Sequence, residues 1–160
     1  GALVLALASE RPRWQLLGLD SSQAALRLAE RNRRALGFET VVFIQSDWLE
    51  ALDGKQRFDL ILSNPPYIEP DDPHLEQGDL RFEPRSALVA GQEGLADIAH
   101  IVQTAPGYLQ PDGWLLIEHG WQQGQAVREL FQKAGFSAVA SHWDLAGHER
   151  VTLGQKADAG

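Results

Sequence analysis

Short apolar runs alternate along this chain with longer segments in which apolar residues recur every three or four positions. The short runs, bounded by turn-forming residues, predict strands at 15–19, 40–44, 58–63, 114–118, 136–142 and 150–153. The longer segments predict helices at 1–10, 22–36, 93–105 and 122–134. The alternation of strands with helices favours an α/β fold, a three-layer sandwich around a mostly parallel sheet.

Two of the predicted helices carry expectations about the core. The helix at 1–10 is apolar on nearly all sides, so we expect it to be buried. The helix at 22–36 is amphipathic, and the residues expected to face the core are Ala25, Leu28, Ala29 and Leu36. Gly37 follows this helix as the expected C-terminal glycine.

The connection at 68–91 has no clear periodicity and holds three prolines. Connections of that length are usually functional or disordered, and this one is expected to form a lid or wall beside a substrate. The polar residues 156–160 show no pattern and are expected to fray. Residues 1–155 are therefore predicted to form one domain, which suits a chain of 160 residues.

The composition narrows the class of protein. With 44% hydrophobic residues the chain can build a sizeable core, and without cysteine it has neither disulfides nor thiolate metal sites. No apolar run approaches the ~18 residues of a membrane span and no signal peptide is evident, so a soluble cytoplasmic protein is expected. The net charge of −8 disfavours a nucleic-acid partner, and the five histidines show no metal-ligand spacing.

The strand at 58–63 ends in a rigid polar corner, Asn64-Pro65-Pro66-Tyr67. The two prolines lack amide hydrogens and have a fixed φ, so they cannot extend the hydrogen-bond ladder of a sheet. In open α/β sheets, ligands bind just beyond the carboxyl ends of strands. The alternative is that these four residues form only a turn, because Asn and Pro are common turn residues.

The corner suits methylation of a planar nitrogen, such as an amide or an exocyclic amine. The side-chain oxygen of Asn64 and the carbonyl of Pro65 can accept the two N–H hydrogens, which fixes the nitrogen and makes its lone pair more available. Tyr67 can stack on the flat acceptor group. We therefore predict that Asn64, Pro65 and Tyr67 are catalytic residues and that Pro66 completes the substrate-binding corner.

An acidic residue, Asp20, follows the predicted strand at 15–19. A carboxylate in this position suits the two hydroxyls of a ribose, because it can accept a hydrogen bond from each. The alternative is that Asp20 caps the following helix, a role for which Ser21 and Ser22 compete. Both interpretations of Asp20 stay open at the level of the sequence.

The corner resembles the (Asp/Asn/Ser)-Pro-Pro-(Tyr/Phe) signature of amino-methyltransferases that use S-adenosylmethionine. Further blocks narrow the resemblance to the HemK/PrmC family of release-factor glutamine N5-methyltransferases. These blocks are Phe82-Glu83-Pro84, Ala87-Leu88, Gly94-Leu95, Glu118-His119-Gly120 and Glu149-Arg150-Val151. The resemblance covers nearly the whole chain, from Gly1 to Gln155, although the corner alone is shared with DNA adenine methyltransferases.

The resemblance implies the rest of the site. Gly1 would be the last glycine of a cofactor-binding loop, Asp47 would accept from the adenine amine, and Trp48 would lie beside the adenine ring. The alternative for Trp48 is an ordinary core position. Asp20 and Asn64 complete the residues expected to bind S-adenosyl-L-methionine.

The sheet of the resembled family has seven strands in the order 3-2-1-4-5-7-6, of which the last is antiparallel. The first strand would be missing here, because the chain begins inside the glycine-rich motif and contains no methionine. We therefore expect a catalytic-domain fragment. The strands at 16–19 and 59–62 should then run parallel at ~10 Å, twice the spacing of hydrogen-bonded neighbours.

The implied function is methyl transfer from S-adenosylmethionine to the Gly-Gly-Gln glutamine of class 1 peptide-chain release factors. Two alternatives stay open, an adenine-N6 methyltransferase acting on nucleic acid and an inactive fragment that binds a protein. The acidic net charge counts against the first. The absence of the full glycine loop keeps the second open.

Overall fold

The computed structural model describes residues 1–66 and 95–157. The chain divides into two compact units, Gly1–Asp53 and Gly54–Gly160, and each unit is described by itself. The whole connection at 68–91, which the sequence predicts to form a lid or wall, lies outside the described residues. No helix in the described ranges is both long and apolar enough to span a membrane.

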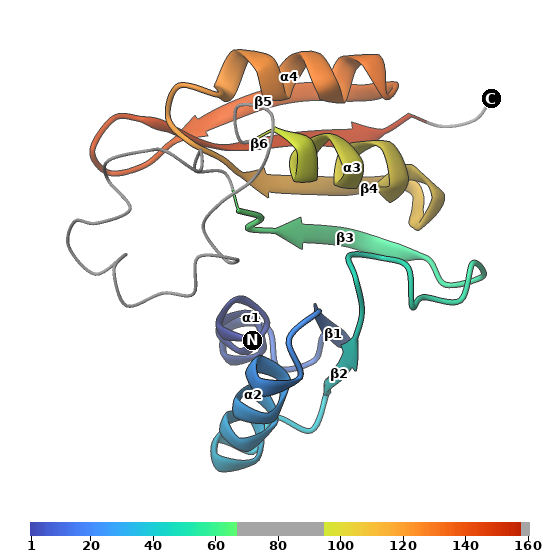
Figure 1. The fold of residues 1–160 in the computed structure, drawn as a ribbon, viewed down its shortest axis with the longest axis vertical. Helices are drawn as coiled ribbons and strands as arrows, with labels where there is room; N and C mark the ends of the chain where they lie inside the picture. Colours follow the sequence, from blue (N-terminus) through green and yellow to red (C-terminus); the bar gives the residue numbers. More distant parts are fainter. Residues whose placement is uncertain (67–94, 158–160) are drawn as a thin grey trace. The chain divides into compact units, whose positions relative to one another are not determined.

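The first unit packs two helices against a two-stranded parallel sheet (Figure 1). Its elements are α1 (Ala2–Glu10), β1 (Leu16–Asp20), α2 (Gln23–Leu36) and β2 (Val41–Gln45). The strands pair from Leu16 opposite Val41 to Asp20 opposite Gln45. Because the pairing is parallel and in register, the carboxyl ends of β1 and β2 stand level with each other.

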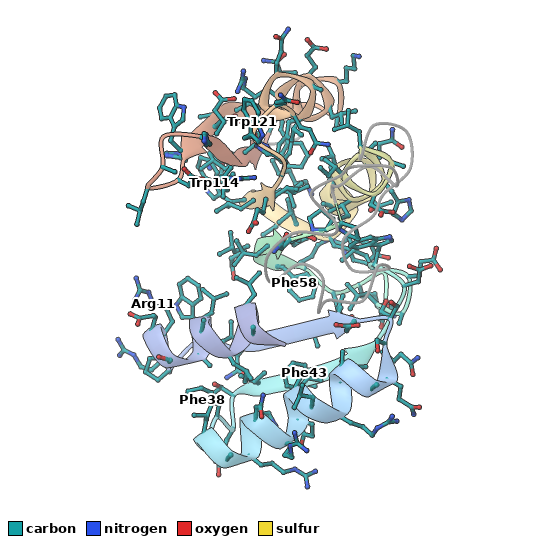
Figure 2. All side chains as sticks on the ribbon, turned by 60° about the vertical axis from the view of Figure 1, so that its left-hand side comes forward. Arg11, Phe38, Phe43, Phe58, Trp114 and Trp121 are labelled. Atoms are coloured by element: carbon teal, nitrogen blue, oxygen red, sulfur yellow. The ribbon has the colours of Figure 1, made fainter. Side chains whose placement is uncertain are left out.

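The core of the first unit is small and leaves much of the first helix exposed. The residues that build it, buried or partly buried, include Leu5, Ala8, Val41, Phe38 and Phe43. Figure 2 labels the two aromatic residues of this set, Phe38 and Phe43. The expectation that α1 is buried on all sides is wrong, because Leu3 on another side of the helix is 48% exposed. An apolar composition does not reveal how many faces of a helix find a partner.

Capping residues define both ends of α2; the sequence predicts Gly37 at the C-terminal end and leaves the N-cap open among Asp20, Ser21 and Ser22. The Ser22 hydroxyl accepts a hydrogen bond from a first-turn amide, and Gly37 closes the helix in the left-handed conformation with φ of 70°. The predicted core face is only partly right, since Ala29 is buried but Leu28 and Leu36 are 49% and 57% exposed. Leu28 lies ~100° around the helix from Ala29, and Leu36 belongs to the last turn.

The second unit is a four-stranded mixed sheet with two helices packed along it (Figure 1). Its elements are β3 (Phe58–Ser63), α3 (Ala96–Thr104), the short helix η4 (Ala105–Gly107), β4 (Leu109–Glu118), α4 (Gly124–Lys133), β5 (Phe136–Trp143) and β6 (Glu149–Lys156). The strand order is β3-β4-β6-β5, in which β3 is parallel to β4 and β6 is antiparallel to both its neighbours. The last strand is thus antiparallel, as the resemblance implies.

The core of the second unit lies between this sheet and the helices. Residues with at most 2% of their surface exposed include Ile98, Ile101 and Val102 of α3, Ala105 of η4, Leu109, Leu115 and Ile117 of β4, and Val127 and Phe131 of α4. The helix α3 ends at Thr104, because Pro106 cannot supply an amide hydrogen to continue it. Pairing with Phe136 carries β6 on to Lys156, so the prediction of a frayed tail from residue 156 is wrong at that residue.

Candidate active site

The carboxyl end of β3 carries the predicted polar corner. The strand ends at Ser63, which is the last of its residues to pair with β4. Beyond it Asn64 is exposed, Pro65 is fully buried and Pro66 is half-buried. The buried Pro65 ring therefore anchors a corner that presents the Asn64 amide to solvent.

The Asn64 side chain is exposed at the end of this strand. Among residues 1–66 and 95–157 the structure shows no hydrogen-bond partner for its oxygen or its amide group. Tyr67, predicted to stack on the acceptor, lies outside the described residues. The described part of the corner thus has the predicted form, an amide side chain beside a proline carbonyl at a strand end, while its catalytic role stays a prediction.

The neighbouring strand ends in a buried histidine for which the sequence suggested no role. Because β3 and β4 are parallel, with Ser63 opposite Ile117, Asn64 and His119 follow their strands at the same edge of the sheet. His119 is fully buried. Burial lowers the pKa of its imidazole, because a charged ring would lose its hydration.

Hydrogen bonds hold the His119 ring at both nitrogens. Nδ1 lies 2.9 Å from the Gly120 carbonyl oxygen, and Nε2 lies 2.8 Å from Thr152 Oγ1 on β6. Thr152 Oγ1 lies in turn 2.8 Å from Ser141 Oγ on β5. Arg128 Nη1, from α4, donates to Ser141 Oγ at 2.7 Å. The imidazole is thus connected through two hydroxyl groups to a guanidinium.

The hydrogen bonds that lead from His119 to Arg128 end in an ion pair between Arg128 and Glu149. Arg128 donates to both carboxylate oxygens of Glu149, at 2.8 and 2.9 Å. Gly124 makes room for the pair, since a Cβ on it would overlap Glu149 Oε2. We call the connected groups the His119 network; they are Gly120, His119, Thr152, Ser141, Arg128 and Glu149. Its members lie far apart in the sequence, so no local pattern reveals it.

The carboxyl ends of β1 and β2 form a second candidate site, within the first unit. Asp20 ends β1, and its Oδ1 accepts a hydrogen bond of 2.8 Å from the Ser22 amide. Ser22 takes the capping role on α2, since its hydroxyl accepts from the Ala25 amide at 3.2 Å. The Asp20 carboxylate is therefore oriented without being the helix cap, and the part of the chain that the structure describes shows no partner for its Oδ2.

Two hydrogen bonds tie these strand ends together. The Ser46 amide donates to the Asp20 carbonyl oxygen at 3.1 Å, and Gln45 Nε2 donates to the Ser21 carbonyl oxygen at 3.0 Å. Ser46 is buried, and its hydroxyl accepts from the Ala51 amide at 3.0 Å. Ser46 is thus a structural support of this edge, and nothing in the sequence beyond its position after a strand marks it for that role.

Asp47 and Trp48 follow directly at the same edge. Asp47 is exposed and Trp48 is half-buried, so Trp48 is not a fully buried core residue. The φ of Trp48 is 44°, in the left-handed region that large side chains rarely adopt. Such strained residues cluster at ligand sites, at a cost of ~1–3 kcal/mol each. The structure thus brings Asp20, Asp47 and Trp48 to one edge of the first unit.

Gly1, the remaining predicted cofactor residue of this unit, has a packing reason to be glycine. It immediately precedes α1 as its N-cap. A Cβ on Gly1 would overlap the Cβ of Ala29 and come within 3.7 Å of the Phe43 ring. Glycine is therefore needed for the start of α1 to lie close to α2, and the predicted role of Gly1 in a cofactor-binding loop stays a prediction.

The sequence is similar to known methyltransferases along almost its whole length. Residues 1–157 match the family model described as a methyltransferase domain. The release factor glutamine methyltransferase of Xylella fastidiosa (strain 9a5c) is 56% identical over 155 residues, which make up 97% of this chain and 56% of that protein. The release factor glutamine methyltransferase of Escherichia coli (strain K12) is 51% identical, with the same coverage of both chains. This chain therefore spans about half the length of the curated relatives it matches.

The fold is also found in solved structures. The crystal structure of a methyltransferase from Pyrococcus furiosus has a TM-score of 0.71, at 16% identity, and covers 98% of this chain and 70% of that chain. Identity this low shows likeness of fold alone. The chain thus has the Rossmann-like fold of methyltransferases.

Proposed function

This chain belongs to the methyltransferase domain family, and from that premise we propose that it transfers the methyl group of S-adenosylmethionine to a glutamine side-chain nitrogen. The acceptor we propose is the glutamine of the Gly-Gly-Gln motif in class 1 peptide-chain release factors. Identity to two release factor glutamine methyltransferases supports this acceptor. The observation that carries the proposal is the exposed Asn64 amide, fixed at the end of β3 by the buried Pro65.

Asn64 and Pro65 would hold the acceptor amide, whose nitrogen carries two hydrogens and a delocalised lone pair. When Asn64 Oδ1 and the Pro65 carbonyl oxygen each accept one hydrogen, the nitrogen is fixed and its lone pair becomes more available for attack. No base has to act first, because the proton can leave the nitrogen after the methyl group has been transferred. Pro66 and Tyr67 would complete the corner, with the Tyr67 ring on the flat amide.

The carboxyl edge of β1 and β2 fits an adenosine group. Asp20 Oδ2 can accept from ribose hydroxyls while Oδ1 keeps its backbone partner. The exposed Asp47 carboxylate can accept from an adenine amine, and the half-buried Trp48 ring offers a flat face. Gly1 would complete this cofactor site within the first unit, and the predicted cofactor contact of Asn64, which belongs to the second unit, stays a prediction. S-adenosylmethionine supplies an electrophilic methyl group on a sulfonium ion.

The strand orders are consistent with the seven-stranded sheet that the resemblance implies. The pair β2-β1 corresponds to strands 3-2 of that order, and β3-β4-β6-β5 corresponds to strands 4-5-7-6. The predicted parallel separation of ~10 Å between the strands at 16–19 and 59–62 stays a prediction, because β1 and β3 belong to different units. An experimental structure of the full-length protein in which β1 and β3 pair directly would contradict this arrangement.

The test is methyl transfer by the full-length protein from radiolabelled S-adenosylmethionine. Three acceptors are compared: a class 1 release factor, the same factor with Gln→Ala in its Gly-Gly-Gln motif, and duplex DNA. We expect label on the first acceptor alone, because only it offers the glutamine amide. Mass spectrometry of the labelled factor should place the methyl group on that glutamine.

The other outcomes separate the rival functions. Label on DNA would favour the adenine-N6 methyltransferase, whose exocyclic amine the same corner could hold. Label on neither acceptor, with binding to the release factor intact, would indicate a protein that binds without catalysis. Label that persists on the Gln→Ala factor would contradict the proposed acceptor residue.

A further inference from the structure

When the His119 ring is neutral, the hydrogen bonds of the His119 network can all form only if their donors point in one direction along the series. The Gly120 carbonyl oxygen only accepts, so His119 Nδ1 must carry the hydrogen of their 2.9 Å bond. Nε2 then carries no hydrogen and accepts the hydrogen bond that Thr152 Oγ1 donates. Because this uses the one hydroxyl hydrogen of Thr152, Ser141 must donate to Thr152.

The opposite end of the network imposes the same direction. Arg128 Nη1 can only donate, and it does so to Ser141 Oγ at 2.7 Å and to Glu149 at 2.8 Å. Ser141 therefore receives a hydrogen from Arg128 and directs its own toward Thr152. Each hydrogen bond from Arg128 through Ser141 and Thr152 to His119 then has one donor and one acceptor, and hydrogen bonds aligned in this way strengthen one another.

A protonated His119 would break this arrangement. Nε2 would then carry a hydrogen, and the Thr152 hydroxyl would have to turn its own hydrogen toward Ser141. Ser141 already accepts from Arg128, and the contacts of the described residues offer its hydrogen no other acceptor. The network therefore favours the neutral ring. The charged groups that act on this ring through space are Glu149, Arg128 and Arg150.

We propose that His119 is a positioning residue for the acceptor corner, a role that rests on the function proposed above. Its amide donates to the Arg150 carbonyl oxygen at 2.9 Å, and its ring is bound to Thr152 on the same strand, β6. Both bonds fix the carboxyl end of β4, the strand that pairs with β3 as far as Ser63. Since the two prolines of the corner cannot donate backbone hydrogen bonds, the position of the corner would depend on the end of this neighbouring strand.

The first measurement is the titration of His119, followed by nitrogen NMR of the full-length protein labelled on histidine. In the wild type we expect the proton on Nδ1 and a ring that stays neutral at pH values where exposed histidines are charged. Thr152→Val keeps the shape of the side chain but removes the donor to Nε2, so the pKa of His119 should rise. Thr152→Ser should restore the wild-type titration. A wild-type ring that carries its proton on Nε2 would overturn the direction of the network.

The second measurement is methyl transfer to the release factor. We expect Thr152→Val to lower kcat about tenfold to a hundredfold, the cost of a misplaced acceptor, with unchanged affinity for S-adenosylmethionine. Ser141→Ala removes the connection between Arg128 and Thr152 and should lower kcat to a smaller extent. Ser137→Ala is the matched control. The Ser137 hydroxyl also links β5 to β6, by donating to the Gln155 carbonyl oxygen, but this bond lies at the surface.

Circular dichroism separates misplacement from unfolding. Wild-type turnover in a folded Thr152→Val protein overturns the positioning role. An equal loss of turnover in the Ser137→Ala control and in Ser141→Ala overturns it as well. If Thr152→Val does not fold, unchanged turnover in Ser141→Ala overturns it instead. A wild-type protein that methylates no release factor refutes the proposed function and the positioning role with it, whereas the titration of His119 still decides the direction of the network.

Discussion

The amide of Ser46 donates a hydrogen bond of 3.1 Å to the carbonyl oxygen of Asp20, and this bond joins the carboxyl ends of β1 and β2. The Asp20 side chain is oriented separately, by the Ser22 amide at 2.8 Å. The carboxylate is therefore held in place before any ligand arrives, which reduces the ordering cost of binding. A fixed carboxylate at the same edge as the exposed Asp47 and the half-buried Trp48 is what the proposed adenosine site would require.

Asp20→Ala should weaken the binding of S-adenosylmethionine rather than slow the chemical step. Hydrogen bonds to a charged group are worth ~1.5–3 kcal/mol, so the dissociation constant should rise about tenfold to a hundredfold. Isothermal titration calorimetry measures this constant. Ser22→Ala is the control, because it removes the cap of α2 at a cost of ~1 kcal/mol in stability but should leave the affinity intact. Equal losses of affinity in both variants would contradict the ribose role of Asp20 and would mean that it only stabilises the start of α2.

Asn64→Ala should abolish most methyl transfer while the affinity for S-adenosylmethionine is largely kept. The variant removes one of the two groups proposed to hold the acceptor amide, and loss of such a group commonly costs ~100-fold or more. Because Asn64 is exposed and Pro65 anchors the corner, the fold should be unaffected. Steady-state rates with the release factor provide the measurement, and turnover near that of the wild type would refute the assignment.

Sequence reasoning succeeded where the signal is local. The end of β3 at Ser63 follows from the prolines Pro65 and Pro66, and the C-terminal end of α2 follows from Gly37. Each feature depends on residues that are close together in the chain. The antiparallel final strand came instead from the family resemblance, since a local pattern of apolar residues carries no information on strand direction.

Prediction from the sequence failed where the place of a residue depends on partners that are distant in the chain. Leu28 and Leu36 are apolar but exposed, because helical spacing does not show which stripe of α2 the small sheet covers. The left-handed φ of Trp48 has no signature in the sequence, since tryptophan normally avoids that region. The His119 network joins residues from β5, β6, α4 and the end of β4, which meet only after the sheet has formed.

The ion pairs of α2 predict a loss of stability in acid. Hydrogen bonds from Arg33 and Arg34 lower the pKa of Glu30 from 4.5 to about 2. Folded Glu30 thus binds its proton less tightly than unfolded Glu30, so its contribution to stability is complete above pH 4.5 and is lost as the pH falls toward 2. Glu30→Gln should therefore flatten the dependence of melting temperature on pH in this window. Glu10→Gln, which changes the same charge outside this cluster, should keep the wild-type dependence, and parallel curves for Glu30→Gln and wild type would contradict the prediction.

Gly124→Ala should destabilise the protein although alanine is the better helix former. In a helix interior this substitution ordinarily stabilises by ~0.5–1 kcal/mol. Here Gly124 is the first residue of α4, and a Cβ on it would overlap Glu149 Oε2 and approach Arg128 Nη1 at 3.2 Å. The Glu149 carboxylate would have to move away from Arg128, so we expect the free energy of unfolding in urea to fall by ~1–3 kcal/mol, as in other overpacked sites.

The matched control for this last substitution is Gly107→Ala in η4. A Cβ on Gly107 would meet no atom within 4 Å, so this variant should show the ordinary, near-neutral effect of replacing glycine. The difference between the two variants then measures the steric demand of the pair between Arg128 and Glu149 rather than the helix propensity of alanine. A Gly124→Ala protein as stable as Gly107→Ala would mean that Glu149 moves aside without cost, and the ion pair at the end of the His119 network would then not be a fixed part of the structure.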